Sequence, residues 1–125
     1  MSDEHEELLF TATDPNGYKV VLSSAQYYGH IISSDKNHQA HPEFTPEEMK
    51  ETIEDPIFIY EGNRPNNDVY ISKKCAQYPY MYLKVAVTTY DDCGDVRTAH
   101  LDDSIIGGIN VKEGGLKYAN YKSGL

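Results

Sequence analysis

Residues 80–90, YMYLKVAVTTY, form a long stretch in which the side chains alternate in character. Successive side chains of a β-strand point to opposite faces, so a strand here has two distinct faces. One face carries Met81, Leu83, Val85 and Val87. The other face carries Tyr82, Lys84, Ala86 and Thr88. We therefore expect a long strand with one face in the core and one mixed face open to solvent.

Three shorter strands are expected beside the long one, because β-branched and aromatic residues recur there between turn-forming clusters. They cover residues 57–60, 69–73 and 96–101. Alternation places Thr98 and His100 of the last strand on one common face. The tail, with its paired glycines, is expected to form a loop or a weak edge strand.

The N-terminal third of the chain predicts a hairpin followed by a helix. Residues 8–13 and 18–22 are strand-like, and the turn sequence DPNG at 14–17 joins them. Ser23 and Gln26 have the spacing of a capping box, which predicts a helix from about residue 24 to 33.

A second helix is predicted more strongly, with Thr45 as its cap and Pro46 at its first position. Met49 and Ile53 lie four residues apart and form its buried stripe. The helix is expected to end before Pro56, because proline disfavours a helical residue before it.

These elements predict one α+β domain, with an N-terminal β-hairpin and two short helices packed on a four-stranded antiparallel sheet. A length of 125 residues is that of a single domain. We assign the domain to residues 8–125. Residues 1–7 contain four acidic side chains and are expected to form an acidic disordered arm.

Composition restricts where the protein acts and what it binds. No apolar run approaches the roughly 18 residues of a membrane span, and no signal-like segment follows the acidic N-terminus. A soluble cytoplasmic protein with reduced Cys75 and Cys93 is therefore expected. The net charge of −9 argues against a large nucleic-acid footprint, yet residues 64–84 contain four basic and only one acidic side chain. A modest basic face is compatible with an acidic remainder.

Five short motifs occur in an order that resembles the phage-barnase-like branch of the superfamily grouping barnase, EndoU, the tRNA-cutting colicins and RelE-type toxins. They are YKVVL at 18–22, YYGHI at 27–31, HPE at 41–43, IEDP at 53–56 before a strand and an arginine, and VRTAH at 96–100. The resemblance covers about residues 8–111. It implies a metal-independent, cofactor-free endoribonuclease that cleaves RNA, with tRNA as one candidate substrate, and leaves a 2′,3′-cyclic phosphate. His100 stands where the family usually has a tyrosine.

The chemistry of metal-free RNA cleavage points to candidate residues without reference to any family. The reaction needs a base, an acid and cations that stabilise the charge growing on the phosphorus oxygens. Histidine suits both proton transfers, arginine and lysine hold phosphate, and hydroxyl groups orient its oxygens. The candidate catalytic residues are His30, Arg64, Tyr70, Lys84, Thr98 and His100. The candidate RNA-binding residues are Lys73, Lys74 and Tyr82.

A geometric expectation follows for this site. The open face of the sheet is expected to display Tyr70, Ser72, Tyr82 and Lys84, and a phosphate is expected between Arg64 and Lys84. Structural alternatives stay open: His30 packing at a helix end, Lys84 extending from a strand towards solvent, and Tyr70 filling a half-buried position.

Two other functional hypotheses are alternatives to a nuclease. His38, His41 and Glu43 are of metal-ligating type, but their spacing in a loop matches no common zinc motif, so we predict no metal site. The acidic stretches favour a non-catalytic module of the same fold that binds RNA or a protein partner, such as an inhibitor. No membrane partner and no small-molecule cofactor are expected.

Overall fold

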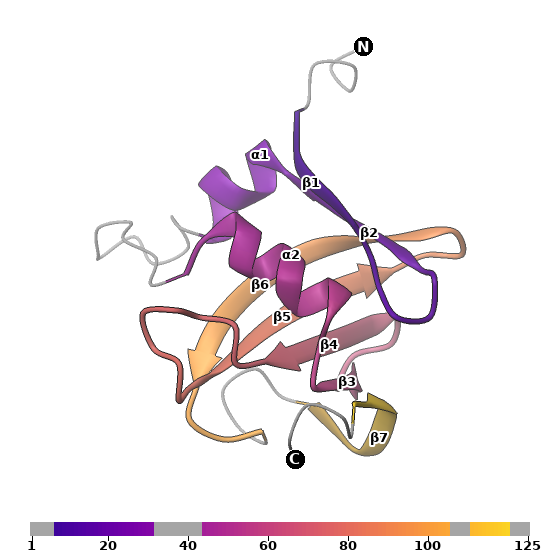
Figure 1. Ribbon diagram of the computed structural model, residues 1–125. Coiled ribbons are helices and arrows are strands. Elements are labelled where there is room, and N and C mark those ends of the chain that lie inside the picture. The colour runs from indigo at the N-terminus through magenta and orange to yellow at the C-terminus, as the bar shows by residue number, and fades with distance from the viewer. Residues whose placement is uncertain (1–6, 32–43, 106–110, 121–125) are drawn as a thin grey trace.

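The computed structural model describes residues 7–31, 44–105 and 111–120, in which seven strands form one mixed sheet (Figure 1). The strand order is β1-β2-β6-β5-β4-β3-β7. The strands are β1 Leu8–Thr13, β2 Lys19–Ser23, β3 Phe58–Gly62, β4 Asn67–Ser72, β5 Tyr82–Thr89, β6 Cys93–Asp102 and β7 Val111–Ala119. The helical segments are α1 Ser24–Gln26, the π-helical turn η2 Tyr27–Ile31 and α2 Pro46–Glu54. None of these helices has the length and apolarity that crossing a membrane requires.

The prediction of a four-stranded antiparallel sheet was wrong. The four expected strands do form the antiparallel centre, β3 to β6, but the sheet continues on both sides. On one side β2 pairs parallel with β6, from Lys19 opposite Cys93 to Val21 opposite Asp95, which joins the hairpin to the sheet. On the other side β7 pairs with β3. Both additions cover strand edges that would otherwise leave backbone groups unpaired.

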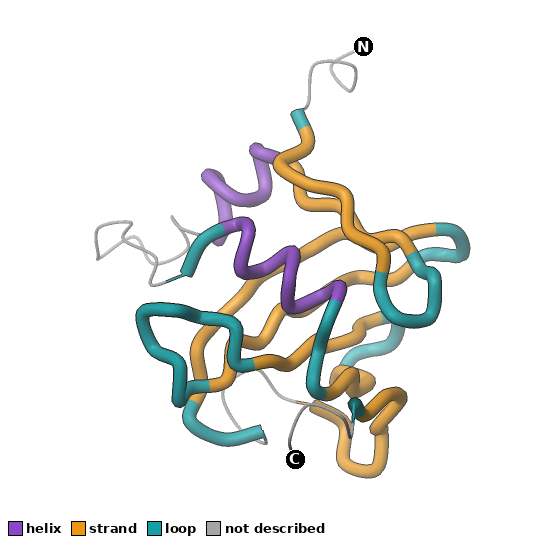
Figure 2. Tube along the Cα trace, in the orientation of Figure 1, coloured by secondary structure: helices purple, strands orange, loops and turns teal. Residues whose placement is uncertain are grey.

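The helical segments cover one face of the sheet (Figure 2). Thr45 and Glu48 form a capping box, α2 ends at Glu54, and its buried residues are Met49, Thr52 and Ile53. The helix packs against β1, β4 and β5. Leu83, Val85 and Val87 are completely buried on this face, as expected. Met81, also expected in the core, is only partly buried and precedes β5.

The first helical segment differs from its prediction. The Ser23 hydroxyl accepts a hydrogen bond from the Gln26 amide at 3.1 Å, which is one half of the expected capping box. The Gln26 side chain does not return to the helix start and instead donates to the carbonyl oxygen of Arg97 in β6 at 2.6 Å. The described helical turns run as far as Ile31, and the expected end near residue 33 lies outside the described residues.

The opposite face, here called the outer face, is partly covered rather than open. Its central positions are Lys84 and Ala86 of β5 with their β6 partners His100 and Thr98. A second apolar cluster covers part of it and consists of Val69, Ile71 and Val111, with Phe58, Tyr60, Tyr82 and Ile105 packed around them. The outer face therefore has a covered part and an exposed part.

The register of β4 against β5 corrects one further expectation. Tyr70 lies opposite Val85 and Ser72 opposite Leu83, whereas Ile71 lies opposite Lys84. Tyr70 and Ser72 therefore occupy the helix-covered face, because residues paired across two strands point to the same side.

Candidate functional site

Thr98 and His100 of β6 lie on the outer face. They pair with Ala86 and Lys84 across β5, so both point to the outer side as alternation predicts. His100 is exposed and Thr98 is half-buried. An imidazole and a hydroxyl are thus available to a ligand on this face.

Lys84 is buried, although partial exposure was expected. Its side chain has no exposed surface, and its ammonium group donates to the carbonyl oxygen of Ile105 at 2.7 Å. It also forms an ion pair with Asp102 at 3.2 Å. The chain turns back after β6 and brings Ile105 over the strand, which removes Lys84 from solvent. Because Lys84 already holds a carboxylate, the expected phosphate site between Arg64 and Lys84 is not supported.

Tyr70 is also fully buried, contrary to the expectation of an exposed hydroxyl. Its hydroxyl donates to the Asp14 carboxylate at 2.6 Å, and the same carboxylate accepts from the amides of Asn16 and Tyr18. Burial and the hydrogen bond to Asp14 raise the pKa of Tyr70 above its usual range. Tyr70 therefore attaches the β1–β2 turn to the central sheet and does not face a ligand.

The expected RNA-binding residues separate into two groups. The Lys73 ammonium lies 4.9 Å from the centre of the Tyr82 ring, so these two residues form a cation–π pair. Tyr82 is half-buried, as expected, and Lys73 is exposed. Lys74 instead pairs with Asp55, just after α2, at 2.9 Å. Only Lys73 and Tyr82 thus belong with the outer face.

Arg64 borders a cavity of about 310 Å³ on the outer face. The cavity is lined by Gly62, Asn63, Arg64, Asn67, Val69, Ala86 and Arg97. Arg97 was not among the expected site residues, because strict alternation puts it on the face opposite Thr98. A β-bulge between Ala86 and Val87 changes this, since Thr98 pairs with Ala86 and Val96 with Val87. Arg64 and Arg97 are the only arginines of the chain, and this was the one feature of the sequence that could have suggested Arg97 as a site residue. It does not show on which face of the sheet Arg97 lies.

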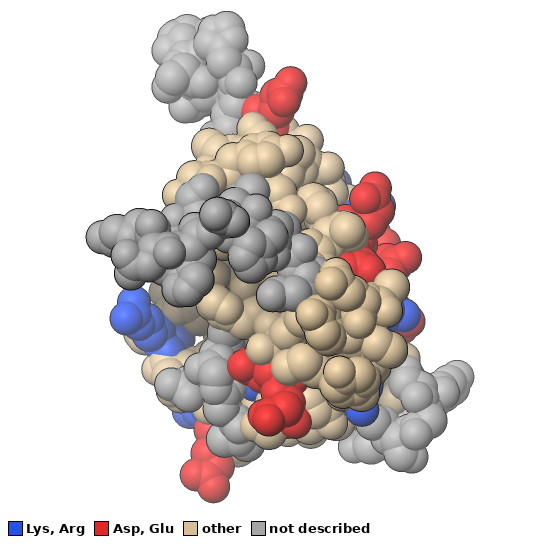
Figure 3. Space-filling model, turned by 90° about the vertical axis from the view of Figure 1, so that its left-hand side faces the viewer, with Lys and Arg blue, Asp and Glu red and all other residues tan. Residues whose placement is uncertain are grey.

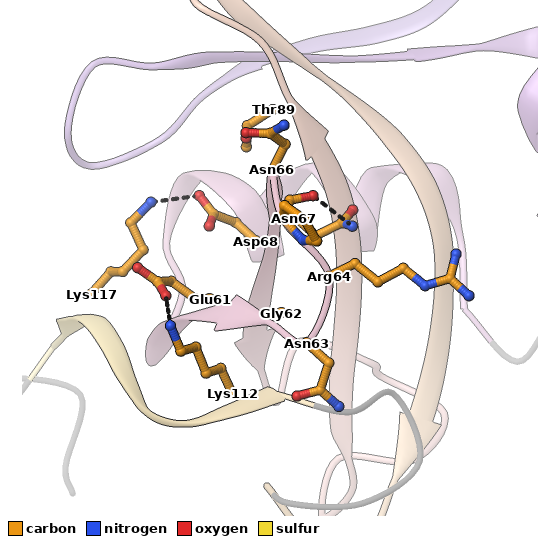
Figure 4. A pocket seen from close by; sticks show the side chains of 11 residues that line it. Glu61, Gly62, Asn63, Arg64, Asn66, Asn67, Asp68, Thr89, Lys112 and Lys117 are labelled. Atoms are coloured by element: carbon orange, nitrogen blue, oxygen red, sulfur yellow. Dashed lines mark hydrogen bonds and ion pairs between the residues drawn. The ribbon is translucent and has the colours of Figure 1, made fainter.

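A larger cavity of about 510 Å³ lies on the other side of the β3–β4 turn (Figure 4). Two ion pairs cross it, Lys117 with Asp68 at 2.8 Å and Lys112 with Glu61 at 3.3 Å. In Figure 4 the Arg64 side chain extends away from both lysines. Arg64 lines this cavity as well, together with the acidic Glu61 and Asp68. Since each of the two lysines already has an acidic partner, this cavity is less suited to an anion than the smaller one, which Arg64 and Arg97 both line.

Charge is unevenly distributed over the surface. The side view in Figure 3 shows acidic side chains gathered at the upper right and a basic group at the left, with both signs present elsewhere on this view. Glu47 and Glu51 of α2 are exposed, as are Arg64 and Arg97 near the outer face. Arg64 and Arg97 thus form a local basic site on a surface of mixed charge.

Several expected ligands fall outside the described structure. The backbone of His30 belongs to η2, and its side chain is not part of the description. His38, His41 and Glu43 lie outside the described residues as well. Within the described ranges, no group of three or more metal-ligating side chains comes together.

No family model, curated protein or solved structure matches this chain. The resemblance to the phage-barnase-like branch thus stays a prediction.

Proposed function

We propose that this domain binds RNA on its outer face and cleaves it without a metal ion. The ribose 2′-oxygen attacks the adjacent phosphorus, the bond to the 5′-oxygen breaks, and a 2′,3′-cyclic phosphate remains. A base removes the proton of the 2′-hydroxyl, and an acid protonates the departing 5′-oxygen. Cations and hydroxyl donors stabilise the charge on the phosphate oxygens in between.

The contact between the helical segment and β6 is the observation that carries this proposal. Gln26 donates to the carbonyl of Arg97, and η2 with His30 follows Gln26 directly. His100 lies three residues beyond Arg97 and is exposed on the outer face. The two histidines suited to the base and acid roles thus belong to η2 and β6, two elements that contact each other. Thr98 faces the same side of β6 as His100, and Arg64 borders a cavity on that face.

Incubation with total tRNA and with mRNA in EDTA tests the proposal. We expect cleavage by the wild-type protein and a loss of roughly 100-fold or more in rate for His30→Ala and for His100→Ala, the usual size of a general acid–base contribution. Lys50→Ala is the matched control, because Lys50 is on α2 and away from the outer face. Absence of cleavage, or equal rates in all variants, would contradict a catalytic function.

A non-catalytic binding module is the alternative, and the burial of Lys84 and Tyr70 favours it. Two of the six candidate catalytic residues have no solvent access, although both are polar groups that a nuclease of this kind could use. A pull-down from cell extract separates the alternatives. Recovery of a protein in the absence of RNA supports the module, whereas recovery of RNA alone, with retention that falls steeply as salt rises, contradicts protein binding.

A further inference from the structure

The outer-face cavity bordered by the two arginines has the composition of an anion site. We propose that Arg64 and Arg97 together hold one backbone phosphate of a polynucleotide there, which makes Arg97 a phosphate-binding residue. This proposal rests on the proposed RNA-directed function. It adds Arg97 to the binding residues and gives the position of one phosphate.

The lining of the cavity suits a phosphate. None of the residues that line it is acidic, although the chain as a whole carries a net charge of −9. Asn63 and Asn67 add side-chain amides, which can donate to phosphate oxygens. The volume of about 310 Å³ is near the lower end of the range for small-ligand sites, roughly 300 to 1,000 Å³. It is therefore matched to a phosphate with its adjoining sugar rather than to a large ligand.

The β-bulge accounts for the presence of Arg97 at this cavity. Val96 and Ala99 are both buried in the core, so two residues rather than one separate these inward positions. Arg97 has no cross-strand partner in the ladder between β5 and β6. A bulge bends the strand and redirects the side chain of the extra residue. The hydrogen bond from Gln26 to the Arg97 carbonyl then holds the bulged backbone in place.

The lack of carboxylate partners at the two arginines, within the described residues, also supports a phosphate site. Five lysines of the described residues each pair with a carboxylate, at 2.8 to 3.5 Å. Neither Arg64 nor Arg97 forms an ion pair within that part of the chain. Two unpaired guanidinium groups at one cavity repel each other, and a shared phosphate relieves that repulsion. The planar guanidinium fork also matches phosphate oxygens with two parallel hydrogen bonds.

Binding to a labelled 2′-O-methyl RNA octamer, measured by fluorescence anisotropy, tests this site apart from catalysis. This probe lacks the 2′-hydroxyl nucleophile, so it cannot be cleaved by the proposed route. We expect Arg97→Ala and Arg64→Ala each to weaken binding about 10- to 100-fold, the range for one charge-assisted contact. The double variant Arg64→Ala/Arg97→Ala should lower the slope of log affinity against log salt by about 0.7, because the two arginines together neutralise one phosphate of a single strand.

Controls and competing ligands make the outcomes distinct. Lys50→Ala removes one positive charge from α2 and should change the affinity less than twofold. Arg97→Lys keeps the positive charge but lacks the planar guanidinium fork, so it should bind with an affinity between those of wild type and Arg97→Ala. Equal effects of Arg97→Ala and Lys50→Ala would overturn the site. Inorganic phosphate at millimolar concentration should displace the octamer poorly, and full displacement would overturn the assignment to a polynucleotide.

The two proposals can fail separately. Arginine-dependent binding of the octamer with no RNA cleavage by the wild-type protein leaves the phosphate site in place and removes the catalytic function. If the wild-type protein cleaves RNA but Arg97→Ala and Arg64→Ala bind the octamer as wild type does, the catalytic function stands and the phosphate site is refuted.

Discussion

Replacing Lys84 with methionine tests whether this lysine is structural or functional. Methionine is similar in length and apolar, so we expect little cavity formation. The cost comes from the Asp102 carboxylate and the Ile105 carbonyl, which lose the ammonium group that both contact. Removing one partner of a buried ion pair costs about 3 to 5 kcal/mol. Because the Asp102 side chain is 16% exposed and water can reach it, we expect the lower end, about 3 kcal/mol.

Urea unfolding followed by circular dichroism measures this loss. Lys50→Met is the matched control, since Lys50 is 40% exposed and its substitution should change the free energy of unfolding by less than about 0.5 kcal/mol. The double variant Lys84→Met/Asp102→Asn removes both charges and should recover part of the stability. If Lys84→Met unfolds like the control but no longer binds RNA, Lys84 belongs to the ligand site and the reasoning is wrong.

Three further substitutions test how the sheet and α2 are held together. Tyr70→Phe removes the hydrogen bond to Asp14 and should cost about 1 to 3 kcal/mol. Above about pH 10 the unfolded chain loses the Tyr70 proton, whereas the raised pKa keeps this residue protonated in the folded state. Wild-type stability should therefore fall above about pH 10, by up to roughly 1.4 kcal/mol per pH unit for this residue. Urea midpoints at pH 9 and pH 11 should differ less in Tyr70→Phe than in wild type, and equal differences would contradict the assignment. Gly94→Ala places a Cβ 2.7 Å from a methyl group of Val87, so thermal unfolding should show a loss of about 1 to 3 kcal/mol, and an unchanged midpoint would refute this packing. Thr45→Ala removes the cap of α2 and should cost about 1 kcal/mol, with a loss below a few tenths speaking against the observed cap.

The central strands were predictable because their signal is local. Alternation in residues 80–90 correctly separated Leu83 and Val85 from Lys84, and the cap at Thr45 marked the start of α2. Both features depend on neighbours within a few positions. The parallel pairing of β2 with β6 joins segments about 70 residues apart and leaves no such local pattern.

Register and bulges explain why the site was only partly predictable. Alternation shows that Tyr70 and Ile71 face opposite sides, but it does not show which of them lies opposite Lys84. A shift of one residue decides whether Tyr70 is a candidate ligand group or part of the core. The bulge at Arg97 adds one residue to one strand, and this insertion brings Arg97 to the cavity with Arg64.

The most direct test of RNA cleavage on the outer face uses a 5′-labelled RNA oligonucleotide in EDTA, with one version carrying a 2′-deoxy sugar at the cleaved position. The proposed mechanism predicts a product that ends in a 2′,3′-cyclic phosphate, no cleavage at the deoxy position, and a loss of roughly 100-fold or more in rate for His100→Ala. Cleavage at the deoxy position, a product without the cyclic phosphate, or no cleavage of any RNA would contradict it.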